Sequence, residues 1–267
     1  MFCHIKTVCL LVLCVLFSLS VEAKDRKKKV SSKLDVYLCI GQSNMAGRGK
    51  LVSAVMDTLQ NVYLLNDKDS FELAVNPLNR YSTIRKGLSM QRLSPAYGFA
   101  KEMAGQTNRP VGLVVNARGG SSIDSWLKGS EDGYYEEALS RVRIALKRGG
   151  VLKAVLWHQG EADCADPESY KLKLISLVKN IRADLDIPNL PVVVGQISQW
   201  NWTKRLEGTV PFNKMISEIS SFIPYSDCVS SEGLDCYKDE TDPHFGTEGQ
   251  LMLGKRYAEK VLRFYGK

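Results

Sequence analysis

The sequence predicts an α/β protein, a three-layer sandwich in which helices cover both faces of a parallel sheet. Short apolar runs rich in valine, isoleucine and leucine alternate along the chain with longer segments of helical apolar spacing. Such alternation is typical of βαβ units, whose strands are parallel and buried on both faces. The 267 residues are 44% hydrophobic and 24% charged, an ordinary globular composition, and no repeat or linker divides them. We therefore expect one domain.

The expected elements follow from turn residues that bound these runs. Ser94-Pro95 and Asp166-Pro167 are helix-start signals, and Gly149-Gly150 ends the helix before it. Residues 67–93 are polar and irregular and predict a long surface excursion. The predicted strands are 36–40, 61–66, 111–116, 151–157, 191–197 and 227–230, and the predicted helices are 95–106, 134–147, 167–185, 210–223 and 246–265.

The N-terminus has the pattern of a secretory signal peptide. A lysine at position 6 precedes an almost wholly apolar run that ends at a small residue, Ala23. We expect residues 1–23 to be this signal peptide, 24–34 a basic tail and 35–267 the folded domain, in a secreted or periplasmic protein. The alternative is an uncleaved membrane anchor, because the basic segment 24–29 lies just past the apolar run.

Charge and cysteine usage exclude several classes of function. The net charge of +7 comes largely from the basic tail and from scattered lysines, without the aromatic–basic interleaving of a nucleic-acid module. Gly47 is followed by Arg-Gly-Lys, which is not the spacing of a phosphate-binding P-loop. Cys228 and Cys236 bracket a polar loop, and export would allow a disulfide between them, but the sequence leaves open whether they are bridged. No cysteine spacing matches a zinc site, so we expect no metal and no cofactor.

One stretch has the features of a nucleophile turn. The β-forming run 36–40 breaks at Gly41, and Ser43 follows directly, with further glycines at Gly47 and Gly49. A buried strand that ends in a tight turn presents the next side chain at the carboxyl edge of the sheet, where open α/β sheets bind ligands. Ser43 is therefore a candidate nucleophile. The alternative is that this serine only caps a short helix.

A serine hydroxyl needs a base to take its proton, and histidine is the usual base near neutral pH. After residue 23 only two histidines remain. His244 lies in Asp242-Pro-His-Phe, where a proline stiffens the loop before the last helix. His158 ends an apolar run and is better explained as a packed, hydrogen-bonded structural residue. We expect His244 to be the base.

Two further loops follow strands and should meet Ser43 at the same edge. Gly119-Gly120 follows one strand, and Gln159 and Glu161 follow the next. A carboxylate would orient the base, and N–H groups would stabilise an oxyanion. Taken one at a time, the glycine pair is also explained as a turn, Glu161 as a solvated acid and Gln159 as a cap.

Four blocks in this order resemble the SGNH-type esterases of the sialate O-acetylesterase and acetylxylan esterase group, carbohydrate esterase family six. They are Gly41-Gln-Ser-Asn-Met-Ala-Gly-Arg48, Ala117-Arg-Gly-Gly-Ser-Ser-Ile123, Trp157-His-Gln-Gly-Glu-Ala-Asp163 and Asp242-Pro-His-Phe245. The resemblance implies a flavodoxin-like (SGNH hydrolase) sheet and metal-free removal of acetyl groups from carbohydrates, such as acetylated xylan or sialic acids, through an acyl-serine.

The resemblance also implies roles for individual residues. Ser43 would be the nucleophile, His244 the general base and Glu161 the carboxylate. The implied oxyanion donors are Ser43, Gly119, Gly120 and Gln159, and the candidate supporting residues are Asp242, Asn44 and Arg118.

The sequence departs from the family pattern next to the base. Many relatives carry an aspartate three residues before the histidine, where this chain has Thr241. Asp242 stands one residue closer, so we expect Glu161 to be the main orienting acid. The alternative is that Asp242 or Asp239 reaches the imidazole through a different loop conformation.

A non-catalytic carbohydrate-binding module is the competing function. It would use Trp126, Trp200 and Trp202 as platforms for sugar rings and would need no serine–histidine pair. For the esterase, we expect Trp200 and Trp202 to lie beside the site and contact substrate.

Overall fold

The computed structural model describes residues 33–200 and 206–266, so the predicted signal peptide and most of the basic tail lie outside the described residues. The strands are β1 (Asp35–Gly41), β2 (Val62–Leu65), β3 (Phe71–Leu73), β4 (Val111–Val115), β5 (Val151–His158), β6 (Val192–Gly195) and β7 (Ser226–Val229). The helices are α2 (Ser43–Ala46), α3 (Pro95–Thr107), α4 (Tyr134–Lys147), α5 (Pro167–Asp184), α6 (Leu206–Ser217) and α7 (Thr247–Arg263). Short 3-10 helices lie at Ser53–Val55, Leu78–Tyr81, Leu88–Met90, Ile123–Trp126 and Ile219–Ser221.

The strands form one sheet in the order β3-β2-β4-β1-β5-β6-β7. All pairs are parallel except β2–β3, which is antiparallel. The parallel α/β sheet is therefore confirmed. β3 was not predicted, because it has only three residues within the polar excursion. Its turn is local: Asn66 Oδ1 accepts hydrogen bonds from the backbone N–H groups of Lys68 and Ser70.

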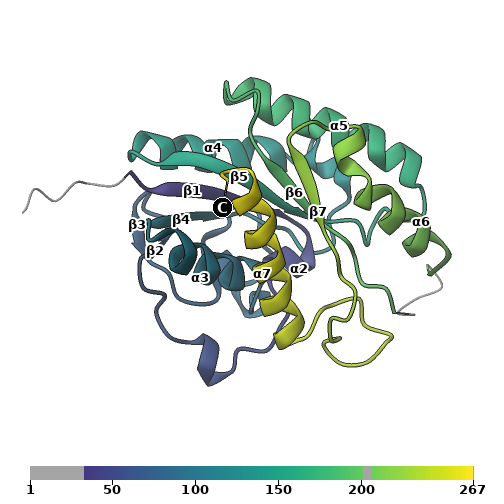
Figure 1. Ribbon diagram of the computed structural model, residues 1–267, viewed down its shortest axis with the longest axis horizontal. Helices are drawn as coiled ribbons and strands as arrows, with labels where there is room; N and C mark the ends of the chain where they lie inside the picture. The colour runs from purple at the N-terminus through teal and green to yellow at the C-terminus, as the bar shows by residue number, and fades with distance from the viewer. Residues whose placement is uncertain (1–32, 201–205, 267) are drawn as a thin grey trace, which may run out of the picture. The chain divides into compact units, whose positions relative to one another are not determined.

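Helices cover both faces of the sheet (Figure 1). Successive side chains of β1 point to opposite faces, so Leu38 and Ile40 join a core with α4, α5 and α6, whereas Tyr37 and Cys39 join one with α3 and α7. Every residue of β1 is buried. A central strand covered on both faces has a continuous apolar run, which is why the sequence marked this segment so clearly.

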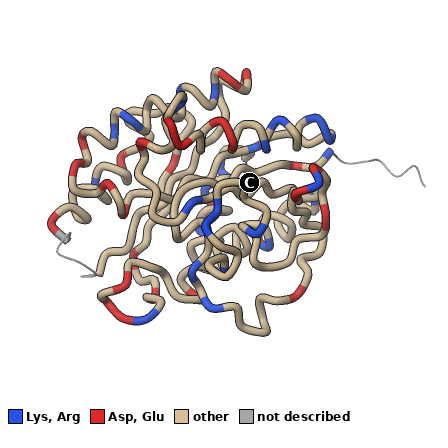
Figure 2. Tube along the Cα trace, turned by 180° about the vertical axis from the view of Figure 1, so that it is seen from behind, with Lys and Arg blue, Asp and Glu red and all other residues tan. Residues whose placement is uncertain are grey.

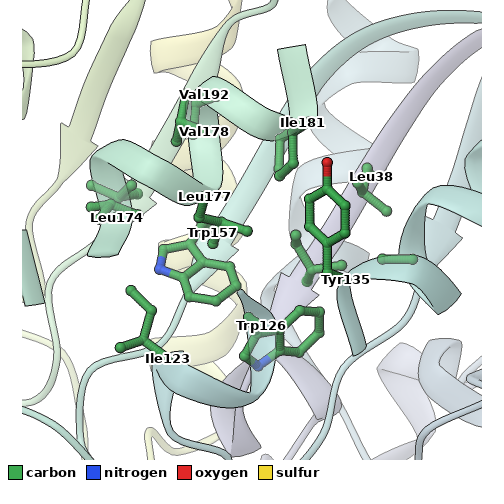
Figure 3. Close-up of a cluster of buried hydrophobic side chains, with 14 of the residues drawn as sticks. Leu38, Ile123, Trp126, Tyr135, Trp157, Leu174, Leu177, Val178, Ile181 and Val192 are labelled. Carbon is green, nitrogen blue, oxygen red and sulfur yellow. The ribbon is translucent and has the colours of Figure 1, made fainter. Parts of the chain in front are cut away.

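The core beneath α4 and α5 contains two tryptophans (Figure 3). The rings of Trp126 and Trp157 meet edge to face, with centroids 5.3 Å apart. Each indole N–H has a partner, since Trp126 donates to Ser121 Oγ and Trp157 to the hydroxyl of Tyr170, both at 2.9 Å. This packing connects the loop after β4 with the end of β5.

The two predicted helix starts differ in detail. Asp166 caps α5 as expected, because its side chain accepts a hydrogen bond from the Ser169 backbone N–H at 3.0 Å. Ser94 occupies the N-cap position of α3 with proline after it, but its hydroxyl makes no capping bond and is buried.

Charges of both signs are interspersed along the chain trace (Figure 2). Within residues 33–200 and 206–266, none of the helices is long and apolar enough to cross a bilayer. Cys228 and Cys236 are both free thiols in the structure, so the disulfide that the sequence left open is not formed there.

The strand order places the nucleophile turn. The chain leaves β1 for one side of the sheet, through β2 and β4, and then returns to add β5, β6 and β7 on the other side. β1 is thus the point where the strand order reverses, with β4 and β5 as its neighbours. Ligands of open α/β sheets bind in the crevice at such a point.

A glycine contact between α3 and α7 predicts a stability change. A Cβ at Gly254 of α7 would overlap backbone atoms of α3 at Pro95 and Phe99. Gly254→Ala should lower the free energy of unfolding by about 1–3 kcal/mol, because the helices must separate. Gly105 of α3 has open space around it, so Gly105→Ala should be neutral or stabilising by up to about 1 kcal/mol. Denaturant unfolding measures both, and an unchanged Gly254→Ala would contradict the prediction.

Candidate active site

The nucleophile turn begins where β1 meets β5. Gly41 has a φ of 134°, and a side chain there would overlap the carbonyl group of His158. The next residue, Gln42, donates its backbone N–H to the same carbonyl oxygen at 2.9 Å. Helix α2 starts at once, so Ser43 stands at the carboxyl edge of the sheet with 6% of its surface exposed.

The loop that carries His244 is closed at its base. Cys236 and Phe245 form an isolated antiparallel bridge, with the Tyr237 N–H donating to the His244 carbonyl oxygen at 2.8 Å. Next to this bridge, on the side away from the loop, the Gly246 N–H donates to the Asp235 carbonyl oxygen at 2.9 Å. These bonds fix both ends of the loop just before α7.

Ser43, His244 and Asp242 form a hydrogen-bonded chain. His244 Nε2 lies 2.9 Å from Ser43 Oγ, and His244 Nδ1 lies 2.6 Å from Asp242 Oδ1. A carboxylate only accepts, so Nδ1 carries the proton and Nε2 is left as the acceptor for the serine hydroxyl. This is the arrangement in which a histidine takes a proton from a serine.

Asp242 reaches the imidazole through a local turn. Its Oδ1 also accepts a hydrogen bond from the His244 backbone N–H at 2.9 Å, two residues on, as in an Asx-turn. Asp239 is used differently: its side chain accepts from the N–H and the hydroxyl of Thr241. The short spacing between Asp242 and His244 is therefore compatible with a triad.

Glu161 does not orient the imidazole, which corrects the expectation from the sequence. Both ring nitrogens of His244 are engaged, with Ser43 and Asp242. Glu161 is buried beside them, and its Oε1 accepts a hydrogen bond from Asn44 Nδ2 at 2.6 Å.

The surroundings of His244 keep its ring neutral near neutral pH. Burial lowers the pKa of His244 below its ordinary 6.5, and the positive charges of Arg48 and Lys238 act in the same direction. Asp242 acts in the opposite direction, because a carboxylate favours the imidazolium. The net lowering leaves Nε2 unprotonated and able to accept a proton.

The loop after β4 lies beside the nucleophile. A Cβ at Gly119 would stand 3.7 Å from Ser43 Cβ on one side and 2.5 Å from Arg48 Nη2 on the other. A side chain at Gly119 would therefore require the Arg48 guanidinium to move. Gly120, next to it, has a φ of 76° and is exposed. Within the described residues, the backbone N–H groups of Ser43 and Gly119 donate to no other group.

Arg48 is a site residue that sequence reasoning missed. Its Nη1 donates to the carbonyl oxygens of Gly47 and Met90 at 2.7 and 2.8 Å, which places the guanidinium over Gly119. The arginine closes the first block of the family resemblance, but nothing in the sequence indicates that it turns back toward the serine.

Gln159 is engaged inside the protein, which corrects its expected place in the oxyanion hole. Its Nε2 contacts the side-chain oxygens of Gln42 and Asp163 and the carbonyl oxygen of Ser121. An amide nitrogen has two hydrogens, and three acceptors already surround it. Asp163 also accepts from the Ser122 hydroxyl and the Ile123 N–H. This buried network ties together the loops after β1, β4 and β5.

Arg118 and His158 have structural partners. The Arg118 guanidinium donates to the Ile84 carbonyl oxygen at 2.9 Å and lies over the ring of Tyr134. His158 is completely buried, with Nδ1 3.1 Å from the Tyr257 hydroxyl, and burial lowers its pKa to about 3. It is the packed structural histidine that the sequence indicated.

The tryptophans do not form a set of sugar platforms. Trp126 is fully buried, so it offers no surface to a ligand. Trp200 lies beside the site, where its indole N–H donates to the Asp242 carbonyl oxygen at 2.7 Å and its ring meets Phe245 edge to face. Trp202 lies outside the described residues, and substrate contact by either side chain stays a prediction.

Comparison with known proteins identifies the family. The family model described as carbohydrate esterase, sialic acid-specific acetylesterase matches residues 33–263. The chain belongs to this family. It is a carbohydrate esterase, and thus a carboxylic ester hydrolase rather than a non-catalytic module.

Individual relatives agree with this assignment. A probable carbohydrate esterase of Arabidopsis thaliana is 29% identical, over 91% of this chain and 97% of that protein. The X-ray structure of an Arabidopsis thaliana protein superposes with a TM-score of 0.73 at 29% identity, covering 86% of this chain and 98% of the other. A carbohydrate acetylesterase from Xanthomonas citri shares the fold, with a TM-score of 0.64, 20% identity and coverage of 87% and 57%.

The space at Gly119 predicts a loss of activity on substitution. Gly119→Ala places a methyl group against Arg48 Nη2 and beside Ser43, so either the guanidinium or the loop with its N–H must shift. We expect kcat/KM to fall on the order of 100-fold, the usual cost of a displacement of about 1 Å in an active site.

The matched control for this variant is Gly87→Ala. Gly87 has negative φ and only the Ser89 hydroxyl near its Cβ position, at 3.8 Å. This control should keep parental kinetics on p-nitrophenyl acetate. A Gly119→Ala enzyme with parental kcat/KM would show that the Gly119 backbone is not part of the reacting site.

Proposed function

We propose that this enzyme removes O-acetyl groups from carbohydrates through an acyl intermediate on Ser43. The observation that carries the proposal is the placement of His244 between Ser43 and Asp242, at 2.9 and 2.6 Å. A base within hydrogen-bond reach of the nucleophile, and itself oriented by a third group, is the signature of nucleophilic catalysis.

In the first half of the reaction, His244 Nε2 takes the proton of Ser43 as Oγ attacks the acetyl carbonyl carbon. Asp242 stabilises the imidazolium that forms, and it also fixed the tautomer beforehand. The tetrahedral intermediate then collapses. His244 gives its proton to the departing sugar oxygen, and the acetyl group remains on Ser43.

The carbonyl oxygen of the acetyl group becomes negatively charged in this intermediate. The Ser43 and Gly119 N–H groups are available to it, since no other group accepts from them among the described residues. Gly120 stays a predicted donor. The Arg48 guanidinium beside Gly119 adds a positive charge close to where the negative charge develops.

In the second half, water takes the place of the sugar. His244 removes a proton from the water, whose oxygen attacks the acyl carbon of Ser43. The second tetrahedral intermediate releases acetate when the proton returns to Ser43 Oγ. No step in this sequence needs a metal ion, which agrees with the chemistry of the three side chains.

We propose acetylated sugars of the sialic acid or acetylxylan type as substrates. The support is the family description, which names a sialic acid-specific acetylesterase, together with the four sequence blocks. Release of acetate from a panel of acetylated glycans distinguishes the two types. The enzyme should be at least about tenfold more active on one of them than on p-nitrophenyl acetate, because contacts beyond the acetyl group contribute binding energy.

We also propose that the chain is exported. The support is the sequence pattern of residues 1–23 alone, and these residues lie outside the described structure. Mass spectrometry of the protein recovered from the medium, the periplasm and the membrane fraction of expressing cells decides between a cleaved signal peptide and a retained anchor.

The triad assignment predicts graded losses. Ser43→Ala removes the nucleophile and should lower kcat on p-nitrophenyl acetate by roughly 10⁴-fold or more. Asp242→Asn leaves the shape unchanged but favours the wrong tautomer of His244, with an expected loss on the order of 10³–10⁴-fold. Asp239→Asn makes the same change on an exposed aspartate of the same loop, so its kcat should stay parental. Activity that survives Ser43→Ala would overturn the serine-esterase mechanism.

A further inference from the structure

Asn44, the residue after the nucleophile, connects the turn to the histidine loop. It is completely buried. Its Nδ2 donates to Glu161 Oε1 at 2.6 Å and to the Pro243 carbonyl oxygen at 3.3 Å. Its Oδ1 accepts from the Phe245 backbone N–H at 3.2 Å and from Gln250 Nε2 at 3.0 Å. The amide thus binds the backbone on both sides of His244.

The two ends of this amide are not interchangeable. If the Asn44 side chain were turned over, its oxygen would face the Pro243 carbonyl and the Glu161 carboxylate, and its NH₂ group would face the Phe245 N–H. An ionised carboxylate accepts hydrogen bonds and does not donate them. Glu161 therefore favours the same orientation of Asn44 that the two backbone groups of the loop require.

We propose that Glu161 is a positioning residue, which acts through Asn44 to hold the 242–245 loop so that His244 stays in register with Ser43. The proposal rests on the serine-esterase function proposed above. It gives the buried acid of the third sequence block a role that needs no contact with the imidazole.

The charge state of Glu161 decides how strongly this arrangement is held. Burial raises the pKa of Glu161 to about 7, and the nearby negative charge of Asp163 acts in the same direction. The hydrogen bonds to Asn44 and to the backbone lower it. Among the described residues, the hydroxyls of Tyr170 and Tyr257 also interact electrostatically with Glu161, and both are neutral because burial raises their pKa values well above the ordinary range.

Ionised Glu161 presents two acceptor oxygens, whereas the protonated form keeps one carbonyl oxygen and gains a donor. Protonation should therefore weaken the selection of the Asn44 orientation without abolishing it. A glutamine at this position is neutral and of the same shape, so it reproduces the protonated acid at every pH.

The test compares Glu161→Gln, Glu161→Met and Asp242→Asn with the parent. Glu161→Gln should lower kcat about tenfold at pH 8, and Glu161→Met about 100-fold, with KM nearly unchanged in both. Asp242→Asn should lower kcat far more.

The dependence of kcat on pH is the second measurement. In the parental enzyme it should show an inflection near pH 7, from Glu161, and a separate fall below pH 6.5, from His244. In Glu161→Gln the inflection near pH 7 should be absent, so that kcat depends on pH only through His244. Its kcat should equal that of the parental enzyme with Glu161 protonated.

Glu168→Gln is the matched control, because Glu168 is exposed at the start of α5, and its profile should be parental. Circular dichroism and thermal unfolding check that each variant is folded, and Glu161→Gln decides alone if Glu161→Met does not fold. A loss in Glu161→Gln as large as in Asp242→Asn, an unchanged pH profile, or a fully active Glu161→Met would each overturn the proposal. Activity remaining in Ser43→Ala would instead overturn the proposed function itself.

Discussion

The close approach of two backbones at the end of β1 is the constraint on which the site depends. β1 and β5 stay paired as far as Gly41 and His158, where no side chain fits between them. The Gln42 N–H completes this contact, and the chain then turns directly into a short helix. Ser43 consequently lies at the end of β1, where the strand order reverses, between the loops after β4 and β5. Strand order brings both loops beside Ser43, and the hydrogen bonds of Gln159 connect them to each other.

Two carboxylates support the base, Asp242 by direct contact with the imidazole and Glu161 from further away. Asp242 is partly exposed and contacts the imidazole itself, where a full negative charge is needed as the ring becomes positive. Glu161 is buried, and in the proposed scheme it acts one hydrogen bond further away, on Asn44. A buried carboxylate is costly to keep ionised, and the hydrogen bond from Asn44 offsets part of that cost.

Much of the fold and part of the site could be predicted from sequence, because both depend on short-range patterns. Apolar runs that end in glycine or histidine indicated the parallel strands and placed Ser43 after the first of them. His244 was predicted as the base because the other candidate, His158, ends such a run. The acid was misassigned because the Asx-turn of Asp242 depends on loop conformation, which spacing does not reveal. The prediction of Gln159 as an oxyanion donor was wrong for another reason. The groups that accept hydrogen bonds from its side chain come from three different loops. Contacts between side chains that are far apart in the sequence leave no periodic pattern from which they could be predicted.

The Asx-turn at Asp242 makes the acid and the base parts of a single three-residue unit. One carboxylate oxygen holds both the backbone N–H and the ring Nδ1 of His244. Any displacement of the loop would carry the pair along intact, so the proton-relay geometry within it is insensitive to loop position. Only the gap between Nε2 and Ser43 Oγ varies with such a displacement. The loop can therefore differ in length or sequence among related chains at the cost of adjusting one distance rather than two.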